Sequence, residues 1–249
     1  MTPEATAAAV KDAFSTLGGG FMLSAQAKAK GKELGTGGWG LYMVGRGGVL
    51  GDADPSVVTA ALHFFPYERV REGWERGRSV VPPAEGVPAF AAVCHEWGRA
   101  HLGDVPGLDK LAEVLPRVIA AADVAGKPLF AGWAAVPLPD DLPALVTQLC
   151  HVLREFRMAC HGIAVAASEL TPLEAVLAGG GAGNAGFFGW PEPYADASAL
   201  VPRREQAEAL TNTLAAAPWA ALEEAERIET SLLLNTAREA ALASLTAAG

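Results

Sequence analysis

The chain has 249 residues, of which 51% are hydrophobic, and a formal net charge of -9. This length can bury a substantial core in one large domain or two small ones. The acidic charge argues against non-specific binding to nucleic acid, which needs clustered Lys and Arg. The nearest basic stretch, residues 69–78, is interrupted by Glu72 and Glu75, as on a solvated helix face. We therefore expect no nucleic-acid partner.

The cysteines and the N-terminus indicate the compartment. Cys94, Cys150 and Cys160 lack CxxC spacing, as is typical of free thiols in a reducing cytoplasm. The first residues are predicted to form an amphipathic helix and lack the features of a signal peptide. No window of about 20 residues is free of charges and helix breakers, so no membrane contact is expected. The sequence predicts a cytoplasmic protein.

The residue pattern favours helices throughout. Ala supplies much of the hydrophobic fraction and β-branched alternation is almost absent, which predicts an all-α, multi-helix bundle. We expect helices, in chain order, over residues 3–17, 21–34, 55–65, 67–78, 89–102, 103–126, 142–167 and 202–245, the last broken at Pro218. The glycines of residues 35–48 permit close backbone approach but form no dinucleotide fingerprint. Residues 177–194 are predicted to be a long glycine-rich loop, either covering a pocket or linking two helices.

An internal repeat is a further hypothesis. Displacing the chain by 88 residues aligns residues 41–69 with 129–157 and pairs His63 with His151. A repeat of this kind would decide the architecture. We expect one all-helical domain over residues 1–249, with two pseudo-equivalent halves of about 1–105 and 106–180 and a C-terminal helical segment at 200–249.

The helix predicted over residues 142–167 concentrates the polar groups. Residues at helical spacing from Leu145 to Ile163 form one apolar side that must be buried. The other side carries His151, Glu155 and His161, and the sequence leaves open whether this stripe faces water or a cavity.

The same residues suggest chemistry without a metal. His151 and Glu155 have the i, i+4 spacing of metal ligands, but His161 lies about 15 Å further along a regular helix. We therefore expect no metal and no cofactor. General acid–base chemistry needs fewer convergent groups, so His63, His151, Glu155 and His161 are the catalytic candidates.

Several other residues are candidates for holding a small-molecule substrate. Arg46 would either anchor an anionic group or pair with Asp52 or Asp54. Ser24 would either contact the substrate or cap a helix. The remaining predicted substrate-binding residues are aromatic: Trp39, Tyr42 and Trp133.

Four segments carry a family resemblance: GGWGLYMVGRGGVLGDADPSVVTAALHFFP, AGKPLFAGWAAVPLPDD, LREFRMACHGIAV and LAAAPWAAL. Together they resemble an actinobacterial family labelled as helix-turn-helix proteins. The central helix of that family usually reads LREHRGDGH and precedes a winged-helix-like section. This sequence keeps Arg154, Glu155, Arg157 and His161 but has Phe156 and MAC where the family has His and GDG. The resemblance implies a divergent member whose winged-helix-like section, between Trp190 and Pro218, is eroded.

These observations lead to one function and two alternatives. We expect a small-molecule protein of secondary metabolism, such as antibiotic biosynthesis, that catalyses a cofactor-free cyclisation, elimination or isomerisation. The alternatives are a non-catalytic ligand-binding or regulatory protein and a structural subunit of a two-protein enzyme. A homodimer or a partner protein remains open, and absence of a pocket beside Arg46 and His63 would favour the subunit.

Overall fold

The computed structural model describes residues 1–247. The regular secondary structure of these residues consists only of α-helices and short 3-10 helices. The predicted all-α, multi-helix fold is therefore confirmed. The α-helices are α1 (Pro3–Ala9), α2 (Lys11–Leu17), α3 (Ala25–Glu33), α4 (Gly37–Gly47), α5 (Pro55–Leu62), α6 (Tyr67–Arg78), α7 (Pro83–Leu102), α8 (Leu108–Ala120), α9 (Pro128–Ala134), α10 (Leu142–Ala167), α11 (Pro172–Phe188), α12 (Val201–Leu214) and α13 (Glu224–Ala247). The 3-10 helices are η1 (Gly20–Leu23), η2 (Gly48–Leu50), η3 (Ser198–Leu200) and η4 (Ala217–Ala221).

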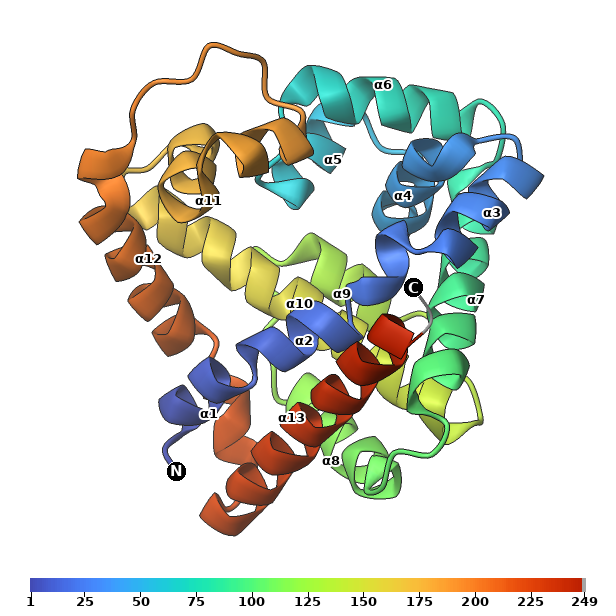
Figure 1. Ribbon diagram of the computed structural model, residues 1–249, viewed down its shortest axis with the longest axis vertical. Helices are drawn as coiled ribbons and strands as arrows, with labels where there is room; N and C mark the ends of the chain where they lie inside the picture. The colour runs from blue at the N-terminus through green and yellow to red at the C-terminus, as the bar shows by residue number, and fades with distance from the viewer. Residues whose placement is uncertain (248–249) are drawn as a thin grey trace.

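Helix α10 crosses the middle of the molecule and contacts α2, α7, α8, α9 and α12 (Figure 1). The predicted apolar side is largely buried, but Ile163 is 38% exposed and departs from that expectation, since it lies near the C-terminal end of the helix. Two residues of the polar stripe lie inside the protein, because His151 and Glu155 are 0% and 1% exposed. They are enclosed among neighbouring helices, whereas His161 lines a pocket and is only partly covered.

Side-chain caps fix where several helices begin. Thr2, Ser24, Asp54, Asp141 and Thr171 are N-cap residues whose side chains accept a hydrogen bond from a backbone N–H of the first turn. Such caps satisfy donors that a helix leaves without partners. The cap at Ser24 divides the helix predicted over residues 21–34 into η1 and α3.

The glycines of residues 35–48 lie mostly within α4, where they allow close helix packing. A Cβ on Gly45 would lie 2.4 Å from the Cβ of Phe90 on α7. A Cβ on Gly77 of α6 would lie 2.6 Å from the carbonyl oxygen of Gly40. Interiors are close-packed, so larger residues would force these helices apart.

The loop predicted over residues 177–194 is wrong for residues 177–188. Helix α11 continues to Phe188, although Gly181 interrupts it with a φ of 67° and Gly189 ends it with a φ of 85°. A capping box between Thr171 and Glu174 starts this helix and outweighs the low helix propensity of the glycines that follow.

Helices α10 and α11 meet at a sharp corner of 109° across residues 168–171. Within residues 1–247, no single helix is long and apolar enough to span a membrane. Helices α10 and α11 reach the necessary length and apolar composition only when taken together, and the bend separates them.

Two apolar clusters form the core. The larger one surrounds α10 and includes Trp74, Trp97 and Trp133. The smaller one gathers side chains of α10, α11 and α12 around Phe64, and Phe188 packs against both clusters. Phe64 of the smaller cluster, Phe65 of the larger one and Phe188, which packs against both, line one pocket where the two clusters meet.

The internal repeat is not confirmed. Thr59 and Thr147 each donate a hydrogen bond to the carbonyl of the Pro four residues earlier, at 2.7 and 2.8 Å. However, α5 ends at Leu62, and His63 has a φ of 61° in a tight turn that the Phe64 N–H closes onto the Leu62 carbonyl. Helix α10 continues without interruption past His151. The two pseudo-equivalent halves remain a prediction.

Candidate functional site

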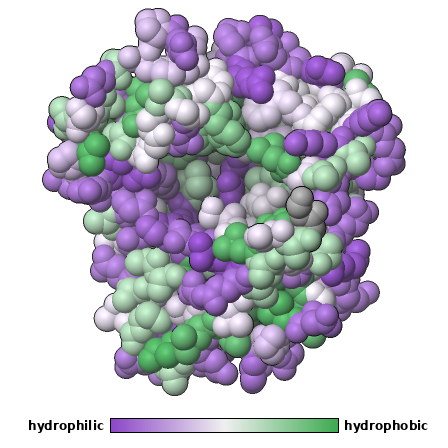
Figure 2. Space-filling view, viewed as in Figure 1, coloured by the Kyte–Doolittle hydropathy of each residue, from purple (hydrophilic) through white to green (hydrophobic). Residues whose placement is uncertain are grey.

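Two adjoining pockets open on the face shown in Figure 2, which is hollowed near its centre. The aromatic pocket has a volume of about 450 Å³ and is lined by Ser15, Gly19, Met22, Leu23, Trp39, Tyr42, Arg46, Leu62, Phe64, Phe65, Arg69, Arg154, Met158, Phe187 and Phe188. The basic pocket has a volume of about 550 Å³ and is lined by Lys11, Asp12, Phe14, Ser15, Arg154, Arg157, Met158, His161, Ala178, Gly179, Val201, Arg204, Glu205 and Glu208. Because Ser15, Arg154 and Met158 belong to both, the pockets form one cleft.

A buried ion pair lies beneath the aromatic pocket. The Arg46 Nε and Nη2 groups of α4 each donate to one carboxylate oxygen of Glu155 on α10, both at 2.8 Å. The two side chains are 3% and 1% exposed, and the Arg46 guanidinium also donates to the Tyr42 hydroxyl. Paired donors of this kind hold a planar carboxylate firmly. Arg46 thus pairs with Glu155, 109 residues away, and not with Asp52 or Asp54.

Arg154 brings a second positive charge to the same carboxylate. Its Nη1 group donates to Glu155 Oε1 at 3.0 Å, and its side chain is 19% exposed into the cleft. Burial alone would raise the pKa of Glu155, but the charges of Arg46 and Arg154 outweigh it and hold that pKa at about 2. Burial and the charge of Arg46 lower the pKa of Arg154, yet an arginine remains protonated in proteins. One carboxylate facing two guanidiniums leaves a net positive charge at the floor of the aromatic pocket.

The walls of the aromatic pocket are flat side chains. Trp39 and Tyr42 stack with ring centroids 5.1 Å apart and an interplanar angle of 7°. The Arg69 guanidinium lies 4.3 Å from the Trp39 ring centroid, close enough for a cation–π interaction. Phe65 and Phe188 meet edge to face at 4.9 Å. The aromatic side chains of this lining come from α4, from the turn after α5 and from α11.

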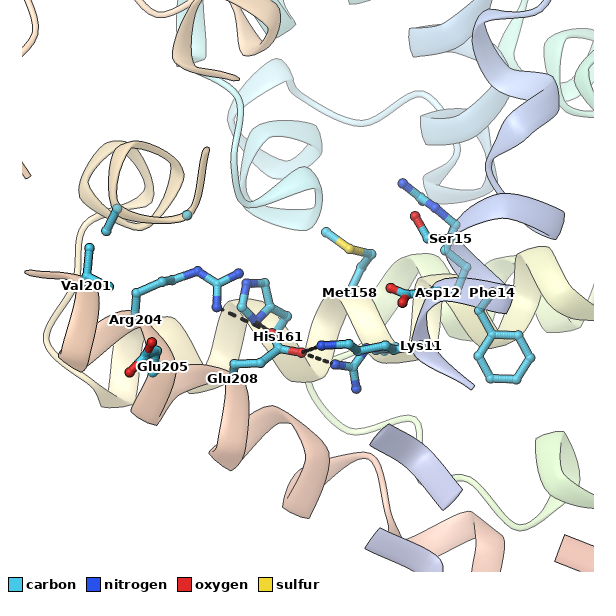
Figure 3. A pocket seen from close by; sticks show the side chains of 14 residues that line it. Lys11, Asp12, Phe14, Ser15, Met158, His161, Val201, Arg204, Glu205 and Glu208 are labelled. Carbon is cyan, nitrogen blue, oxygen red and sulfur yellow. Dashed lines mark hydrogen bonds and ion pairs between the residues drawn. The ribbon is translucent and has the colours of Figure 1, made fainter. Parts of the chain in front are cut away.

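Glu208 of α12 is the centre of the basic pocket (Figure 3). It accepts hydrogen bonds from Arg157 Nη2 at 2.5 Å, Lys11 Nζ at 3.3 Å and Arg204 Nη1 at 3.4 Å. Burial raises the pKa of Glu208, but its cationic neighbours outweigh burial and hold the pKa below its usual range. A single ionised carboxylate therefore faces three cations.

His161 also lines the basic pocket, and its hydrogen bond fixes the tautomer. Thr211 Oγ1 donates to the Ala207 carbonyl at 2.7 Å, so at 2.8 Å it accepts from the Nδ1–H of His161. Burial and nearby positive charge lower the pKa of His161 to about 4. The imidazole is neutral near pH 7 and keeps an unprotonated Nε2.

His151 and His63 lie outside the lining of the cleft. The Nδ1–H of His151 donates to the Gly18 carbonyl at 3.1 Å, and burial lowers its pKa to about 4. His63 lines a separate apolar groove of about 420 Å³. Its ring lies against α10, where a Cβ on Gly162 would be 2.3 Å from His63 Nδ1.

The structure brings some of the predicted site residues together and separates others. Trp39, Tyr42 and Arg46 line the aromatic pocket, and Glu155 supports it from below. Ser24 is the N-cap of α3 and is not among the lining residues. Trp133 is fully buried behind the site and donates to the Arg46 carbonyl at 3.0 Å. Their proposed catalytic and binding roles remain predictions.

Sequence reasoning overlooked Arg69, Arg154 and Phe188 as pocket residues. Arg154 adjoins Glu155 in the sequence, and this adjacency could have indicated it. The other two carry no local signal, because the turn after α5 and the kink in α11 bring them to the pocket.

Comparison with known proteins gives one match. The profile of a helix-turn-helix family matches residues 7–248. The chain belongs to this helix-turn-helix family. No curated protein and no solved structure matches it.

Family membership overturns one expectation. Helix-turn-helix modules are DNA-binding motifs, so the prediction of no nucleic-acid partner is wrong. That prediction rested on the net charge of -9, which averages over the whole chain and hides local clusters of arginine.

Several helix pairs of this helix-turn-helix protein are joined by three or four residues, the length expected of the motif. Helices α10 and α11 meet at 109° across a four-residue break, within the usual range for the motif. However, α11 contains Glu174 and neither Lys nor Arg. Helices α5 and α6 are also joined by four residues, and α6 contains Arg69, Arg71, Arg76 and Arg78. The predicted winged-helix-like section, residues 190–218, contains α12 and no strand.

Proposed function

We propose that this helix-turn-helix family protein binds a small aromatic anion in the cleft. The observation that carries the proposal is the lining of the aromatic pocket, which includes three arginines and six aromatic side chains but no carboxylate. Such a lining is unusual for a chain with a net charge of -9. A pocket of about 450 Å³ is within the usual range for small-molecule sites.

Each part of the lining has a role in the proposal. Arg154 offers a guanidinium that Glu155 neutralises only in part, and Arg69 forms no ion pair within residues 1–247. These two would hold the anionic group. The stacked pair of Trp39 and Tyr42 would contact the planar part of the ligand.

Acid–base catalysis remains a prediction. Of the four candidates, only His161 lines the cleft, where Thr211 holds its Nδ1–H and leaves Nε2 unprotonated. Its pKa of about 4 makes it a weak base near pH 7. Glu155 is a poor base while two arginines hold its pKa at about 2. A role in secondary metabolism likewise remains a prediction. The cavity beside Arg46 weighs against the alternative of a purely structural subunit.

Binding of 2-naphthoate, measured by isothermal titration calorimetry, tests the proposal. A charge-assisted hydrogen bond contributes about 1.5–3 kcal/mol, so Arg154→Gln should weaken binding by about tenfold or more. Trp39→Ala should also weaken it. Arg117→Gln, which removes a cation paired with Glu226 outside the cleft, is the matched control and should leave binding unchanged. Equal affinity in all three variants would overturn the proposal.

A second candidate function is nucleic-acid binding, which family membership favours. Helix α6 would supply phosphate contacts, and its exposed Arg76 forms no ion pair within the described part of the chain. The test is fluorescence anisotropy of labelled duplex DNA at about 50 and 200 mM salt. Affinity should fall steeply with salt and should be lower in Arg76→Gln. No binding at the lower salt concentration would exclude this candidate.

A further inference from the structure

The basic pocket contains more positive charge than its central carboxylate compensates. Lys11, Arg157 and Arg204 reach Glu208 from α2, α10 and α12, respectively. Arg157 is the most deeply buried of the three cations, and taking a charge out of water costs desolvation energy that its partners must offset. The whole lining has four cations, Lys11, Arg154, Arg157 and Arg204, against three carboxylates, Asp12, Glu205 and Glu208. The pocket therefore keeps an excess of positive charge, and three of its cations meet at Glu208.

One of these cations has an unused donor. The side chain of Arg157 is 13% exposed, and its Nη1 atom is buried with no hydrogen-bond partner in residues 1–247. An unpaired buried donor costs about 1–3 kcal/mol. An anion would remove this penalty if it accepted a hydrogen bond from Nη1 itself.

The surroundings leave room for an anion beside these groups. Gly179 of α11 lies against Arg204, where a Cβ would be 3.3 Å from its Nε, so the absence of a side chain lets the guanidinium lie along the helix. The other carboxylates in the lining, Asp12 and Glu205, are exposed, and water and salt weaken their repulsion of an anion.

We propose that the basic pocket binds the phosphate group of a ligand whose aromatic part lies in the adjoining aromatic pocket. A phosphate monoester carries about -1.5 to -2 charge at pH 7 and would offset the excess of positive charge around Glu208. Its three oxygens can accept from Arg157, Arg204 and Lys11 together, and arginine binds phosphate through paired donors. The link between the two parts would pass Ser15, Arg154 and Met158, which line both pockets. The inference rests on the proposed function, because the aromatic pocket supplies the other half of the ligand.

Titration with inorganic phosphate, with and without saturating 2-naphthoate, tests this assignment. The expected result is that both probes bind at once. Arg204→Gln should weaken phosphate binding by about tenfold and leave 2-naphthoate binding within about twofold, whereas Trp39→Ala should do the reverse. Competition between the probes would overturn the assignment, because phosphate would then occupy the aromatic pocket. Unchanged phosphate binding in Arg204→Gln would also overturn it.

Two further comparisons are informative. The first distinguishes a site for a phosphate ester from a site for the free phosphate ion, and the second separates the phosphate site from the proposed binding of an aromatic anion. A subsite for an ester leaves one side of the phosphate open toward the aromatic pocket, so methyl phosphate should bind about as well as inorganic phosphate. Rejection of methyl phosphate would show a site for the free ion and overturn the assignment to a ligand's phosphate. If phosphate binds and depends on Arg204 while 2-naphthoate does not bind, the proposed function fails and the phosphate site stands.

Discussion

Replacing Glu155 with Gln should destabilise the protein strongly. The substitution keeps the size of the side chain but leaves the 3%-exposed guanidinium of Arg46 without its counter-charge. Breaking a buried pair in this way costs about 3–5 kcal/mol. The same pairing lowers the pKa of Glu155 from 4.5 to about 2, a shift that corresponds to about 3 kcal/mol. A loss of that size would remove a large part of the stability of a typical domain.

Urea unfolding at pH 7, followed by circular dichroism, measures this loss. Glu68→Gln is the matched control, because Glu68 pairs with Arg71 at 2.7 Å on the exposed side of α6 and should leave the midpoint unchanged. If Glu155→Gln does not fold, Arg46→Met combined with Glu155→Leu removes both charges of the buried pair and should recover folded protein, because the remaining Arg154 is partly exposed to the cleft. Equal midpoints for Glu155→Gln and Glu68→Gln would refute the reasoning.

The same ion pair predicts a dependence on pH. A carboxylate whose pKa is lower in the folded chain stabilises the fold above the unfolded pKa, and this contribution is lost as pH falls through the folded value. The contribution of Glu155 should therefore disappear between about pH 4.5 and pH 2. Unfolding that shows no additional destabilisation in this interval would contradict the pairing.

Four further measurements test other parts of the structure. The free energy of unfolding should fall as pH decreases from 6.5 toward 4, because His151 and His161 bind protons more readily in the unfolded chain than in the folded one. A free energy of unfolding that stays constant over that interval would contradict this. Gly18→Ala should cost about 1–3 kcal/mol, because its Cβ would lie 2.5 Å from the Cys150 carbonyl oxygen, whereas Gly183→Ala, with open space around it, should not. Thr171→Ala should cost about 0.5–2 kcal/mol through loss of the capping box, measured as a lower Tm. The three buried cysteines should react with a thiol reagent quickly only in urea, and rapid reaction of the native protein would contradict their burial.

The sequence predicted helices best where the apolar period was regular. Helix α10 occupies residues 142–167 as expected, because Pro143 and Asp141 mark its start and its apolar positions repeat at helical spacing. Helix α11 was missed because its glycines favour loops, and only its capping box and tertiary packing explain the helix.

The candidate site was harder to predict, because its key contacts join distant residues. Nothing in the local pattern indicates that Arg46 and Glu155 form a pair across 109 residues. The polar stripe of α10 has the composition of a solvated face, and only the surrounding helices show that His151 and Glu155 lie inside. The family resemblance was confirmed, whereas the inference from net charge to the absence of a nucleic-acid partner was wrong.

The most direct test of the central claim compares 2-naphthoate with the neutral 2-naphthamide in wild-type protein and in Arg154→Gln. The two probes share an aromatic body, so their affinity ratio isolates the contribution of the negative charge. The wild type should prefer 2-naphthoate by about tenfold or more, and Arg154→Gln should lose most of that preference. An equal preference in both proteins would contradict the claim that the arginines of this cleft select an aromatic anion.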